Sequence, residues 1–458
     1  MSNAINGGTI DDIVNEARAA KESGAHTFWS SQIFGHDALT VLADDGGSFS
    51  VSNPATNIAH ITFNGEMAGI DQELLEVAVF AAPPGDPTVT LDLNTAEVDD
   101  IIWATSSQRG QQGGDLGRMA ALDAGYDVRA SAVTLDRFCG SGITSVNLAA
   151  ASVLSGMEDC VIAGGTEMMS NYGLGGNDVP ALLDNGNLHL RHLHPQPHQG
   201  VCADAIAAME GISREDCDRL GLLSQERAAQ AISEGRFARS LIPVHRDDGS
   251  LALDRDEYPR AGTTMESLGQ LKAVFGQFAD RPLDETGTTY RQLIEAVYPD
   301  LKFDAVHHAG NSSGVVDGAA ALLLASPAYA RAQGWKPRAR IVAMANIGDS
   351  PTLMLNAPVP AARKVLAKAG LTVDDIDLWE INEAFAVVAE KFIRDLRLNR
   401  DKVNVNGGAM ALGHPIGATG SILIGTLLDE LERRDLQTGL VTMCTGGGMG
   451  TATIIERI

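Results

Sequence analysis

One sequence unit occurs twice in this chain, and it narrows the range of possible folds more than any other feature. Each copy has a glycine-rich turn, a helix, a short apolar run and a second glycine turn. The first copy extends from Gly140 to Gly165 and the second from Gly417 to Gly448. Glycine turns beside apolar strands let two backbones approach closely. The repetition indicates that an α/β domain occurs twice in the chain.

Strands and helices alternate from about Val98 onward. Short apolar runs between turn residues predict buried strands, and longer runs with apolar residues at helical spacing predict helices. This order is typical of α/β proteins whose sheets are covered by helices. The predicted strands are Asp99–Trp103, Cys160–Ala163, Ile341–Ala345, Asp377–Glu380 and Gly439–Met443, and the predicted helices are Ile143–Leu154, Pro360–Ala369, Glu383–Leu396 and Ser421–Arg433.

A region of different composition separates the two halves. Asn171–Gly200 is rich in Gly, Asn, His and Pro and is predicted to be a loop, whereas Cys202–Phe237 is charged and predicted to be helical. Met265–Phe275 is predicted to be a short helix. Connections this long are usually functional, so we interpret the region as an insertion. Its histidines lack acidic or cysteine neighbours at a suitable spacing, so no metal site is predicted. They are His189, His192, His194 and His198.

Charge and cysteine content limit the possible partners. The chain has 34 Lys and Arg against 59 Asp and Glu, a net charge of −25. Nucleic acids and anionic membranes are therefore unfavourable partners, although helix N-termini can still hold the phosphates of a small ligand.

The five cysteines form no CxxC pair, which is typical of a reducing compartment. Without a signal peptide or an apolar run of about 20 residues, a cytoplasmic protein is expected.

Cys139 is the first candidate for chemistry. It ends a strand-like run and stands before a helix start, in the run Arg-Phe-Cys-Gly-Ser-Gly that begins at Arg137. A helix N-terminus stabilises a thiolate, and the glycines leave room for a substrate beside the backbone. A buried core cysteine is the alternative interpretation.

Three further candidates also lie beside glycines or between predicted elements. His414 stands in a glycine-rich loop that suits a positioned base, with a core histidine as the alternative. Cys444 ends an apolar run, and the backbone N–H of Gly446 and its neighbours could form an oxyanion hole; a core cysteine is again the alternative. Asn382 follows a strand and precedes a helix, so it is either a site residue or an N-cap.

Together these runs resemble the thiolase family. The matching stretches occur in the family's order and cover about Val98 to Ile458. Each stretch alone is a weak signal, whereas five in order are a strong one. They are Arg137–Gly142, Ala309–Gly314 with Asp317–Ala319, Asn382–Ala386, Gly407–Ala409 with Gly413–Ala418, and Cys444 with Gly446–Gly448.

The resemblance implies an α/β fold of the thiolase type. Such a fold duplicates an α/β domain with a mixed five-stranded sheet, is layered αβαβα, and carries an inserted loop domain. The implied boundaries are 1–90 for an atypical N-terminal segment, 91–330 for the N-terminal domain with its insertion at 171–303, and 331–458 for the C-terminal domain. A homodimer or homotetramer is also implied.

The resemblance implies a role for each matching residue. In thiolases the Cys matching Cys139 carries the acyl group, the His matching His414 activates that thiol, and the Cys matching Cys444 moves the proton at the substrate α-carbon. The Asn matching Asn382 holds a water in one oxyanion hole, which the His also lines. Backbone N–H groups matching those of Cys139 and Gly446 form the second oxyanion hole.

The implied reaction is acyl transfer between coenzyme A thioesters. It is either thiolytic cleavage of a 3-oxoacyl-CoA to acetyl-CoA and a shortened acyl-CoA, or the reverse Claisen condensation of two acetyl-CoA. Coenzyme A is a substrate here, no cofactor or metal is implied, and Ser313 matches a family residue near the pantetheine arm. The C-terminal end and the residues before Cys139 resemble the degradative, β-oxidation branch more closely.

Two other functions are alternatives. A ketosynthase shares the fold, but it usually has two histidines and no second cysteine. A non-catalytic thiolase relative that binds acyl-CoA or lipid would tend to lose the cysteine or the histidine. Both Cys139 and His414 are present in this chain.

The N-terminal segment departs from the thiolase pattern. A thiolase normally opens with a strand, an Arg-Thr-Pro-like turn and a long helix. Here Val77–Gly85 could supply the strand, but too few residues follow for the long helix. The first 44 residues instead resemble the start of a luciferase-like oxidoreductase, in a fragment too short to bind a flavin. This departure bears on the stability of the N-terminal domain and on dimerisation more than on the catalytic residues.

Overall fold

The computed structural model describes residues 78–80, 93–171, 183–246 and 248–458. The segment that resembles an oxidoreductase lies outside the described residues. The strands are β1 Ala78–Phe80, β2 Asp100–Ala104, β3 Ser131–Leu135, β4 Cys160–Met168, β5 Val244–His245, β6 Leu251–Leu253, β7 Asp317–Ala325, β8 Ala339–Gly348, β9 Leu378–Ile381, β10 Thr438–Thr445 and β11 Met449–Arg457. The α-helices are α2 Leu116–Asp123, α3 Ser141–Ser155, α4 Leu188–Leu193, α5 Gln199–Glu210, α6 Arg214–Ser233, α7 Met265–Gly269, α8 Gly276–Ala279, α9 Tyr290–Glu295, α10 Pro327–Ala332, α11 Pro358–Ala369, α12 Ala386–Leu396, α13 Ala409–Leu412 and α14 Ile416–Arg433.

Two mixed sheets repeat one pattern of strand order and direction. The first sheet has the order β1-β7-β4-β2-β3 and the second has the order β8-β11-β10-β9. In both sheets the first two pairings are antiparallel, and the pairings β4–β2 and β10–β9 that follow are parallel. The strand expected in Val77–Gly85 is present as β1. The duplication inferred from the sequence is therefore confirmed at the level of topology.

The second sheet differs from the expected five strands. Where the first sheet adds β3 beside β2, the second has only a parallel bridge between Val403 and Trp379 of β9. Extended backbone cannot continue there, because the next residue, Asn404, has a left-handed φ of +46°. Within the described residues, the prediction of five strands is correct for the first sheet and wrong for the second.

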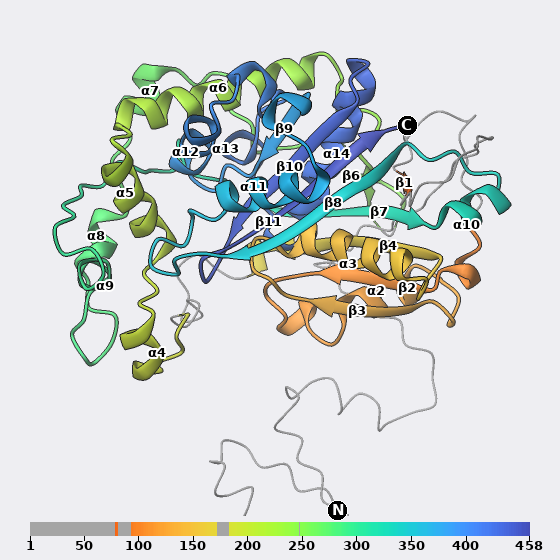
Figure 1. Ribbon diagram of the computed structural model, residues 1–458, viewed down its shortest axis with the longest axis horizontal. Coiled ribbons are helices and arrows are strands. Elements are labelled where there is room, and N and C mark those ends of the chain that lie inside the picture. The colour runs from red at the N-terminus through yellow and green to blue at the C-terminus, as the bar shows by residue number, and fades with distance from the viewer. Residues whose placement is uncertain (1–77, 81–92, 172–182, 247) are drawn as a thin grey trace, which may run out of the picture. The chain divides into compact units, whose positions relative to one another are not determined.

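Helices α3 and α14 lie between the two sheets (Figure 1). Their apolar residues pack in one core with side chains of both sheets, such as Val161 of β4 and Val441 of β10. Neighbouring strand residues point the other way, as expected from the two-residue period of a strand. Leu440 faces the core under α11 and α12, while the outer face of the first sheet packs against α2 and α10. The result is the predicted αβαβα layering.

The two central helices touch backbone to backbone at their N-terminal ends. A Cβ on Gly142 would lie 2.8 Å from Gly420 N, and one on Gly420 would lie 2.0 Å from Ile143 N. Neither position can carry a side chain without moving a helix. The window Phe138–Ser155 has the length and apolarity of a membrane span, but 61% of it is buried inside the protein, as in a core helix. The glycine contact places the starts of α3 and α14 side by side.

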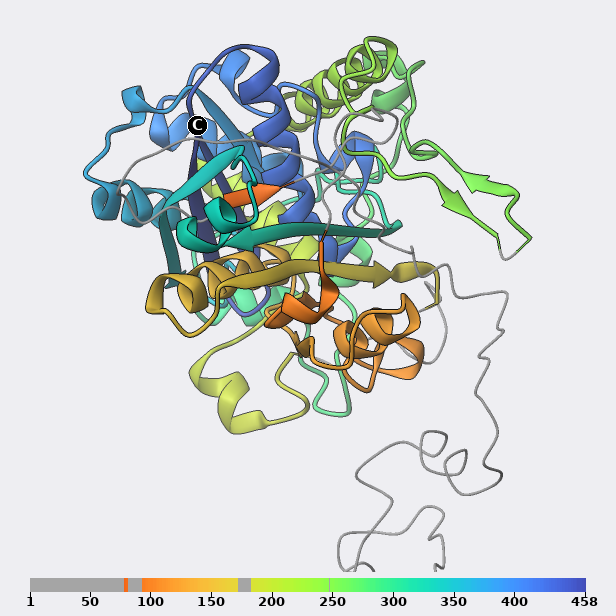
Figure 2. The same ribbon diagram turned by 90° about the vertical axis from the view of Figure 1, so that its right-hand side faces the viewer.

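The inserted region contains more helix than its composition predicts. Helix α4 lies within the segment expected to be a loop, because the Asn187 side chain caps it by accepting a hydrogen bond from Leu190 N at 3.1 Å. Gly211 has a φ of +62° and separates α5 from α6, so Cys202–Phe237 is not one helix. Figure 2 shows the β5–β6 hairpin, in light green, projecting from this region.

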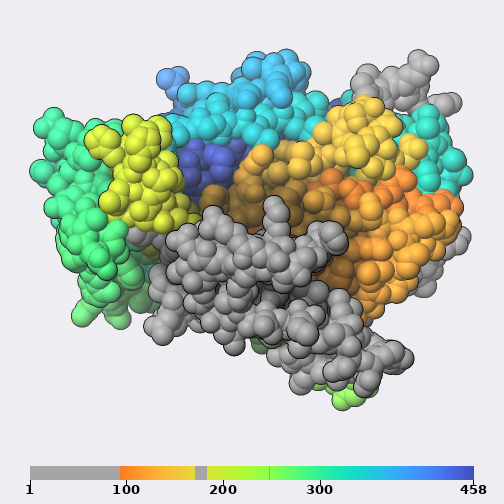
Figure 3. Space-filling view, turned by 90° about the horizontal axis from the view of Figure 1, so that it is seen from below, coloured from red at the N-terminus to blue at the C-terminus, as the bar shows by residue number. Residues whose placement is uncertain are grey.

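A buried ion pair ties the two ends of the insertion together. The Arg191 guanidinium on α4 binds Asp184 at 2.6 Å and Asp284 at 2.7 Å. Figure 3 shows the α4 segment, in yellow, beside the green segment that contains α8 and α9. Because Arg191 is 6% exposed and Asp184 is 3% exposed, their contact is shielded from water. The insertion is therefore a packed unit.

Candidate active site

Cys139 lies in a tight turn at the start of α3. Phe138 has a left-handed φ of +49°, and the Ser141 hydroxyl donates a hydrogen bond to Phe138 O at 2.6 Å. The backbone N–H groups of Cys139 and Gly446 hydrogen-bond to the Cys139 sulfur and lower its pKa. Burial has the larger effect and raises the pKa of Cys139 to about 12. The resting sulfur is therefore a thiol: the backbone N–H groups favour the thiolate, as expected from the helix start, but burial outweighs them.

His414 is buried immediately before α14, and its hydrogen bonds define its tautomer. Its Nδ1 lies 2.6 Å from Thr419 Oγ1, and the Thr419 hydroxyl donates to Pro415 O at 2.9 Å. A hydroxyl has one proton, so Oγ1 must accept from Nδ1–H, which leaves a lone pair on Nε2. Burial lowers the pKa of His414 to about 4, so the imidazole is neutral near pH 7. Nε2 is therefore ready to accept a proton.

Asn382 lies on the Nε2 side of this imidazole. Its Nδ2 is 3.3 Å from His414 Nε2, a distance at which the amide can donate to the lone pair. Phe385 is the N-cap of α12, so Asn382 is not the helix cap that its sequence position also allowed. Its Oδ1 is buried and has no hydrogen-bond partner among the described residues. A buried amide oxygen of this kind can hold a water or a substrate group.

The second cysteine, Cys444, is near the end of β10, opposite Gly450 of β11. Burial raises the pKa of its thiol, and a thiolate at Cys139 would raise it further. The two thiols therefore lie within range of each other's charge. Both thiols are uncharged at rest. Each can therefore give its proton to a base or to an enolate, and the resulting thiolate can take a proton back.

The glycine turn after Cys444 brings backbone N–H groups to the site. Gly447 and Gly448 have φ values of +74° and +75°, which favour glycine. A Cβ on Gly448 would lie 2.5 Å from Ser350 O, and one on Gly446 would lie 2.8 Å from the Phe138 ring. The turn is thus packed closely on two neighbouring loops, and this packing aims Gly446 N–H at the Cys139 sulfur.

A strap formed by residues 311–314 connects the loop after β9 with the loop before α14. On one side Ser313 N–H donates to Ala384 O at 3.0 Å. On the other side Gly314 O accepts the N–H of His414 at 2.8 Å. The strap therefore holds the base by its backbone, and it places the half-buried Ser313 beside the two loops.

Sequence reasoning missed the role of Thr419 in holding this site, and it predicted for Glu167 only structural packing near the active site or a dimer contact. Thr419 sets the His414 tautomer, and a threonine in the first turn of a helix gives no signal of that role. Glu167, at the end of β4, accepts hydrogen bonds from Gly417 N and Ser106 N, both at 2.9 Å. Its carboxylate joins the strand ends to the first turn of α14, a contact between residues far apart in sequence that no local pattern reveals.

The histidines of the insertion have other roles. His189 and His192 lie in α4, and His198 caps α5 by accepting from Gly200 N at 3.1 Å. The His198 ring also stacks on Phe278 with centroids 5.4 Å apart. Across the described ranges, no group of three or more His, Cys, Asp or Glu could hold a metal ion.

Comparison with known proteins places this site in a family. Residues 72–278 match the profile described as the thiolase N-terminal domain, and residues 335–457 match that of the thiolase C-terminal domain. An acetyl-CoA acetyltransferase of Chromobacterium violaceum is 41% identical over 381 residues, which cover 80% of this chain and 88% of that protein. A beta-ketoadipyl-CoA thiolase of Acinetobacter baylyi is 38% identical over 384 residues, with 80% and 89% covered.

A solved structure agrees with the assignment. The crystal structure of the Bacillus anthracis acetyl-CoA acetyltransferase matches with a TM-score of 0.67 and 34% sequence identity, and the match covers 80% of this chain and 89% of that one. Both halves of the chain, their order and their fold agree with one family. The chain belongs to the thiolase family of acyltransferases.

Proposed function

We propose that this thiolase carries the acyl group on Cys139 and uses His414 as the base that activates it. The observation that supports this most strongly is the neutral His414 imidazole, whose Nδ1 proton is held by Thr419 and whose Nε2 carries a lone pair that faces Asn382 Nδ2 at 3.3 Å. Because burial raises the pKa of Cys139 to about 12, the thiol needs such a base before it can attack a carbonyl.

In thiolysis, His414 Nε2 takes the Cys139 proton and the sulfur attacks the 3-oxo carbon of the substrate. The bond between carbons 2 and 3 breaks, and the electron pair forms the enolate of acetyl-CoA. Cys444 gives its proton to that enolate, so acetyl-CoA leaves. The Cys444 thiolate then takes the proton of free coenzyme A, whose sulfur attacks the acyl group on Cys139 and releases the shortened acyl-CoA, while the proton on His414 returns to Cys139.

Two donor sets would stabilise the negative oxygens of these steps. The N–H groups of Cys139 and Gly446 hydrogen-bond to the nucleophilic sulfur in the resting protein, so they lie beside the place where an oxyanion on the attacked carbon would form. His414 and a water on the unpartnered Oδ1 side of Asn382 would serve the enolate oxygen. Two developing charges on two thioesters explain why the site has two sets.

The relatives indicate the substrate class. Their names include acetyl-CoA acetyltransferase, 3-ketoacyl-CoA thiolase and beta-ketoadipyl-CoA thiolase, so we propose a 3-oxoacyl-CoA with the pantetheine arm near Ser313. The cleavage direction, as in β-oxidation, follows from the resemblance of the segments around Cys139 and at the C-terminus. Two thiols at one site favour a thiolase over a ketosynthase, and the intact Cys139–His414–Cys444 set argues against a relative that only binds.

We also propose that the protein is a homodimer built on β3. This strand is an edge of the first sheet, and Ser131 and Val133 on it are exposed. Val133 has 45% of its surface exposed. An apolar edge strand with free backbone groups is a template for pairing with another strand. A second copy of the same strand would satisfy those groups in an isologous interface.

A thiolysis assay tests the proposed function. The losses of acetoacetyl-CoA and of 3-oxohexadecanoyl-CoA are followed with free coenzyme A, for the natural chain, Cys139→Ala and Cys160→Ala. We expect activity that Cys139→Ala abolishes and that Cys160→Ala, a buried cysteine outside the site, retains. The ratio of the two substrates gives the preferred chain length. A folded but inactive natural chain would contradict the proposed reaction, and an active Cys139→Ala would contradict the mechanism.

A further inference from the structure

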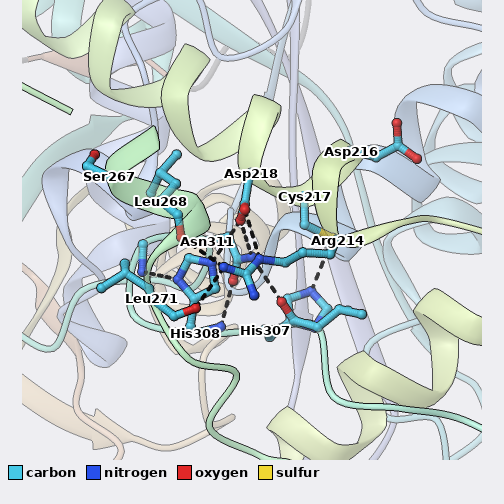
Figure 4. Close-up of polar contacts among 12 residues, drawn as sticks. Arg214, Asp216, Cys217, Asp218, Ser267, Leu268, Leu271, His307, His308 and Asn311 are labelled. Carbon is cyan, nitrogen blue, oxygen red and sulfur yellow. Dashed lines mark hydrogen bonds and ion pairs between the residues drawn. The ribbon is translucent and has the colours of Figure 1, made fainter. Parts of the chain in front are cut away.

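A buried charged cluster lies directly behind the strap, outside the proposed catalytic set (Figure 4). Its centre is Asp218 on α6, whose side chain is 4% exposed. Asp218 Oδ1 is 2.8 Å from His308 Nε2 and 2.8 Å from Asn311 Nδ2. Asp218 Oδ2 accepts from Arg214 Nε, also at 2.8 Å. One carboxylate therefore binds three side chains from two segments.

The hydrogen bonds of His308 define its proton position as well. Gly310 N–H donates to His308 Nδ1 at 3.0 Å, so Nδ1 must be the acceptor and Nε2 must carry the proton given to Asp218. His308 N–H in turn donates to Asn311 Oδ1 at 2.7 Å. The side chains of His308 and Asn311 are thus held by hydrogen bonds both to Asp218 and to the backbone of the turn, and these bonds fix its conformation.

This turn is the beginning of the strap. Asn311 O accepts the N–H of Ala386, and three residues later Gly314 O accepts the N–H of His414. Helix α6 sits close behind, because a Cβ on Gly221 would lie 2.5 Å from Gly310 O. Any displacement of the turn therefore moves the backbone that holds His414.

The other end of the cluster is in the insertion. Arg214 uses its second nitrogen to donate to Leu268 O at 2.8 Å and Leu271 O at 2.9 Å, at the end of α7. Asp218 and Arg214 are one turn apart on α6, so the helix fixes the positions of the two side chains relative to each other. A continuous path of polar contacts thus runs from α7 through Asp218 to the strap.

We propose that Asp218, through His308 and Asn311, is a positioning residue that holds the strap, and with it His414, in the geometry needed for catalysis. Asp218 touches neither the proposed base nor the proposed nucleophile, so its effect is transmitted through backbone hydrogen bonds. The inference rests on the proposed function of His414. Because the path also reaches α7, it ties the geometry of the base to the inserted region.

The test compares Asp218→Asn with Asp429→Asn, which removes one buried carboxylate from another arginine pair elsewhere. Melting temperature, kcat and KM are measured for thiolysis of acetoacetyl-CoA. We expect Asp218→Asn to lower kcat by about 10- to 100-fold with little change in KM, since small misplacements of a catalytic group cost rates of this order. Asp429→Asn should lower the melting temperature but keep kcat.

A second pair of variants, both at His308, separates the effect of its hydrogen bond to Asp218 from the effect of its packing. The Gln side chain in His308→Gln can still donate to Asp218, whereas His308→Leu cannot, so kcat should be largely retained in the first and reduced in the second. If all four variants keep the natural kcat while folded, or if Asp218→Asn and Asp429→Asn lose kcat equally, the positioning role is refuted. An inactive natural chain would instead refute the proposed function, so the two failures are distinguishable.

Discussion

At the scale of single residues, the chemistry depends on protons whose positions the structure defines. Thr419 can accept from His414 only because its own proton goes to Pro415 O. Burial keeps the imidazole neutral and the Cys139 thiol protonated, so the pair begins each cycle uncharged. The sequence predicted the types and order of Cys139, His414, Cys444 and Asn382. It could not predict Thr419, because a tautomer depends on atoms brought together by the fold.

The role of Thr419 is tested by two substitutions at that position. Thr419→Val keeps the shape but removes the acceptor for Nδ1–H, so the imidazole is free to adopt the other tautomer. We expect kcat for thiolysis to fall by about 100-fold or more, because a catalytic histidine in the wrong tautomer is a poor base. Thr419→Ser keeps the hydroxyl and should stay within about threefold of the natural rate, well short of the loss from a misplaced base. Equal rates in the two variants would exclude the role assigned to the hydroxyl.

The depressed pKa of His414 also predicts a pH dependence of stability. Its pKa is about 4 in the folded protein and about 6.5 when unfolded. Between these values the unfolded chain binds a proton that the folded chain does not, so the free energy of unfolding falls as the pH drops from about 6.5 to about 4. His414→Gln removes this contribution, which is of the order of 3 kcal/mol.

Urea denaturation at several pH values in that range gives the measurement. The free energy of unfolding of His414→Gln should decrease less steeply with falling pH than that of the natural chain. The buried carboxyl of Glu383, whose pKa is raised, acts in the opposite direction in both proteins and cancels in the comparison. Parallel pH profiles would show that His414 titrates normally in the folded state.

At the scale of secondary-structure elements, the contact between α3 and α14 decides the geometry of the site. The helix starts that carry Cys139 and His414 are adjacent because Gly142 and Gly420 let the two backbones meet. The sequence predicted both helices and their glycine turns, since small residues at helical spacing indicate close packing. It did not predict β7, β11 or α4. Strand β11, Met-Gly-Thr-Ala-Thr-Ile-Ile-Glu-Arg, is recognisable as a strand only through its pairing with β8 and β10.

Two glycines on α14 give a matched test of this contact. Gly420→Ala would place a Cβ 2.0 Å from Ile143 N, whereas a Cβ on Gly425 would have nothing within 4 Å. We expect Gly420→Ala to destabilise the protein by about 3 kcal/mol and to abolish thiolysis, because the central helices must separate. Gly425→Ala should be neutral or stabilise by about 0.5–1 kcal/mol, as alanine favours a helix. The measurements are thermal unfolding and thiolysis activity of both variants. A stable, active Gly420→Ala would contradict the claim that the two helices must touch at this position.

At the scale of the whole molecule, the duplicated fold brings the proposed catalytic residues together. Cys139 follows β3, the last strand in the order of the first sheet. His414 follows the bridge between Trp379 and Val403, which has the corresponding position in the second sheet. In each half a central helix begins just after the proposed catalytic residue, so the site lies where the two halves meet. Cys444 lies near the end of β10, whereas the equivalent strand in the first half, β4, carries Glu167 near its end. The sequence repeat predicted the duplication but could not show that equivalent positions carry different chemistry. The domain boundaries 91–330 and 331–458 stay a prediction.

The proposed dimer is also a property of the whole molecule. Val133→Lys would place a charge on the exposed face of the β3 edge and should shift the protein from dimer to monomer. Val342→Lys is the matched control, since Val342 is 37% exposed on β8, the edge of the other sheet. Sedimentation analysis of both variants and the natural chain gives the result. A natural chain that is monomeric, or a dimer that Val133→Lys leaves intact, would contradict an interface on β3.

The central claim is that Cys139 carries the acyl group. It is tested most directly by mixing the protein with acetoacetyl-CoA or acetyl-CoA in the absence of free coenzyme A, quenching in acid, and locating the acyl group by peptide mass spectrometry. We expect one acetyl group as a thioester on the peptide that contains Cys139. The label should be lost on adding coenzyme A and absent from Cys139→Ala. An acetyl group found on Cys444, or none in a protein that turns over, would contradict the account.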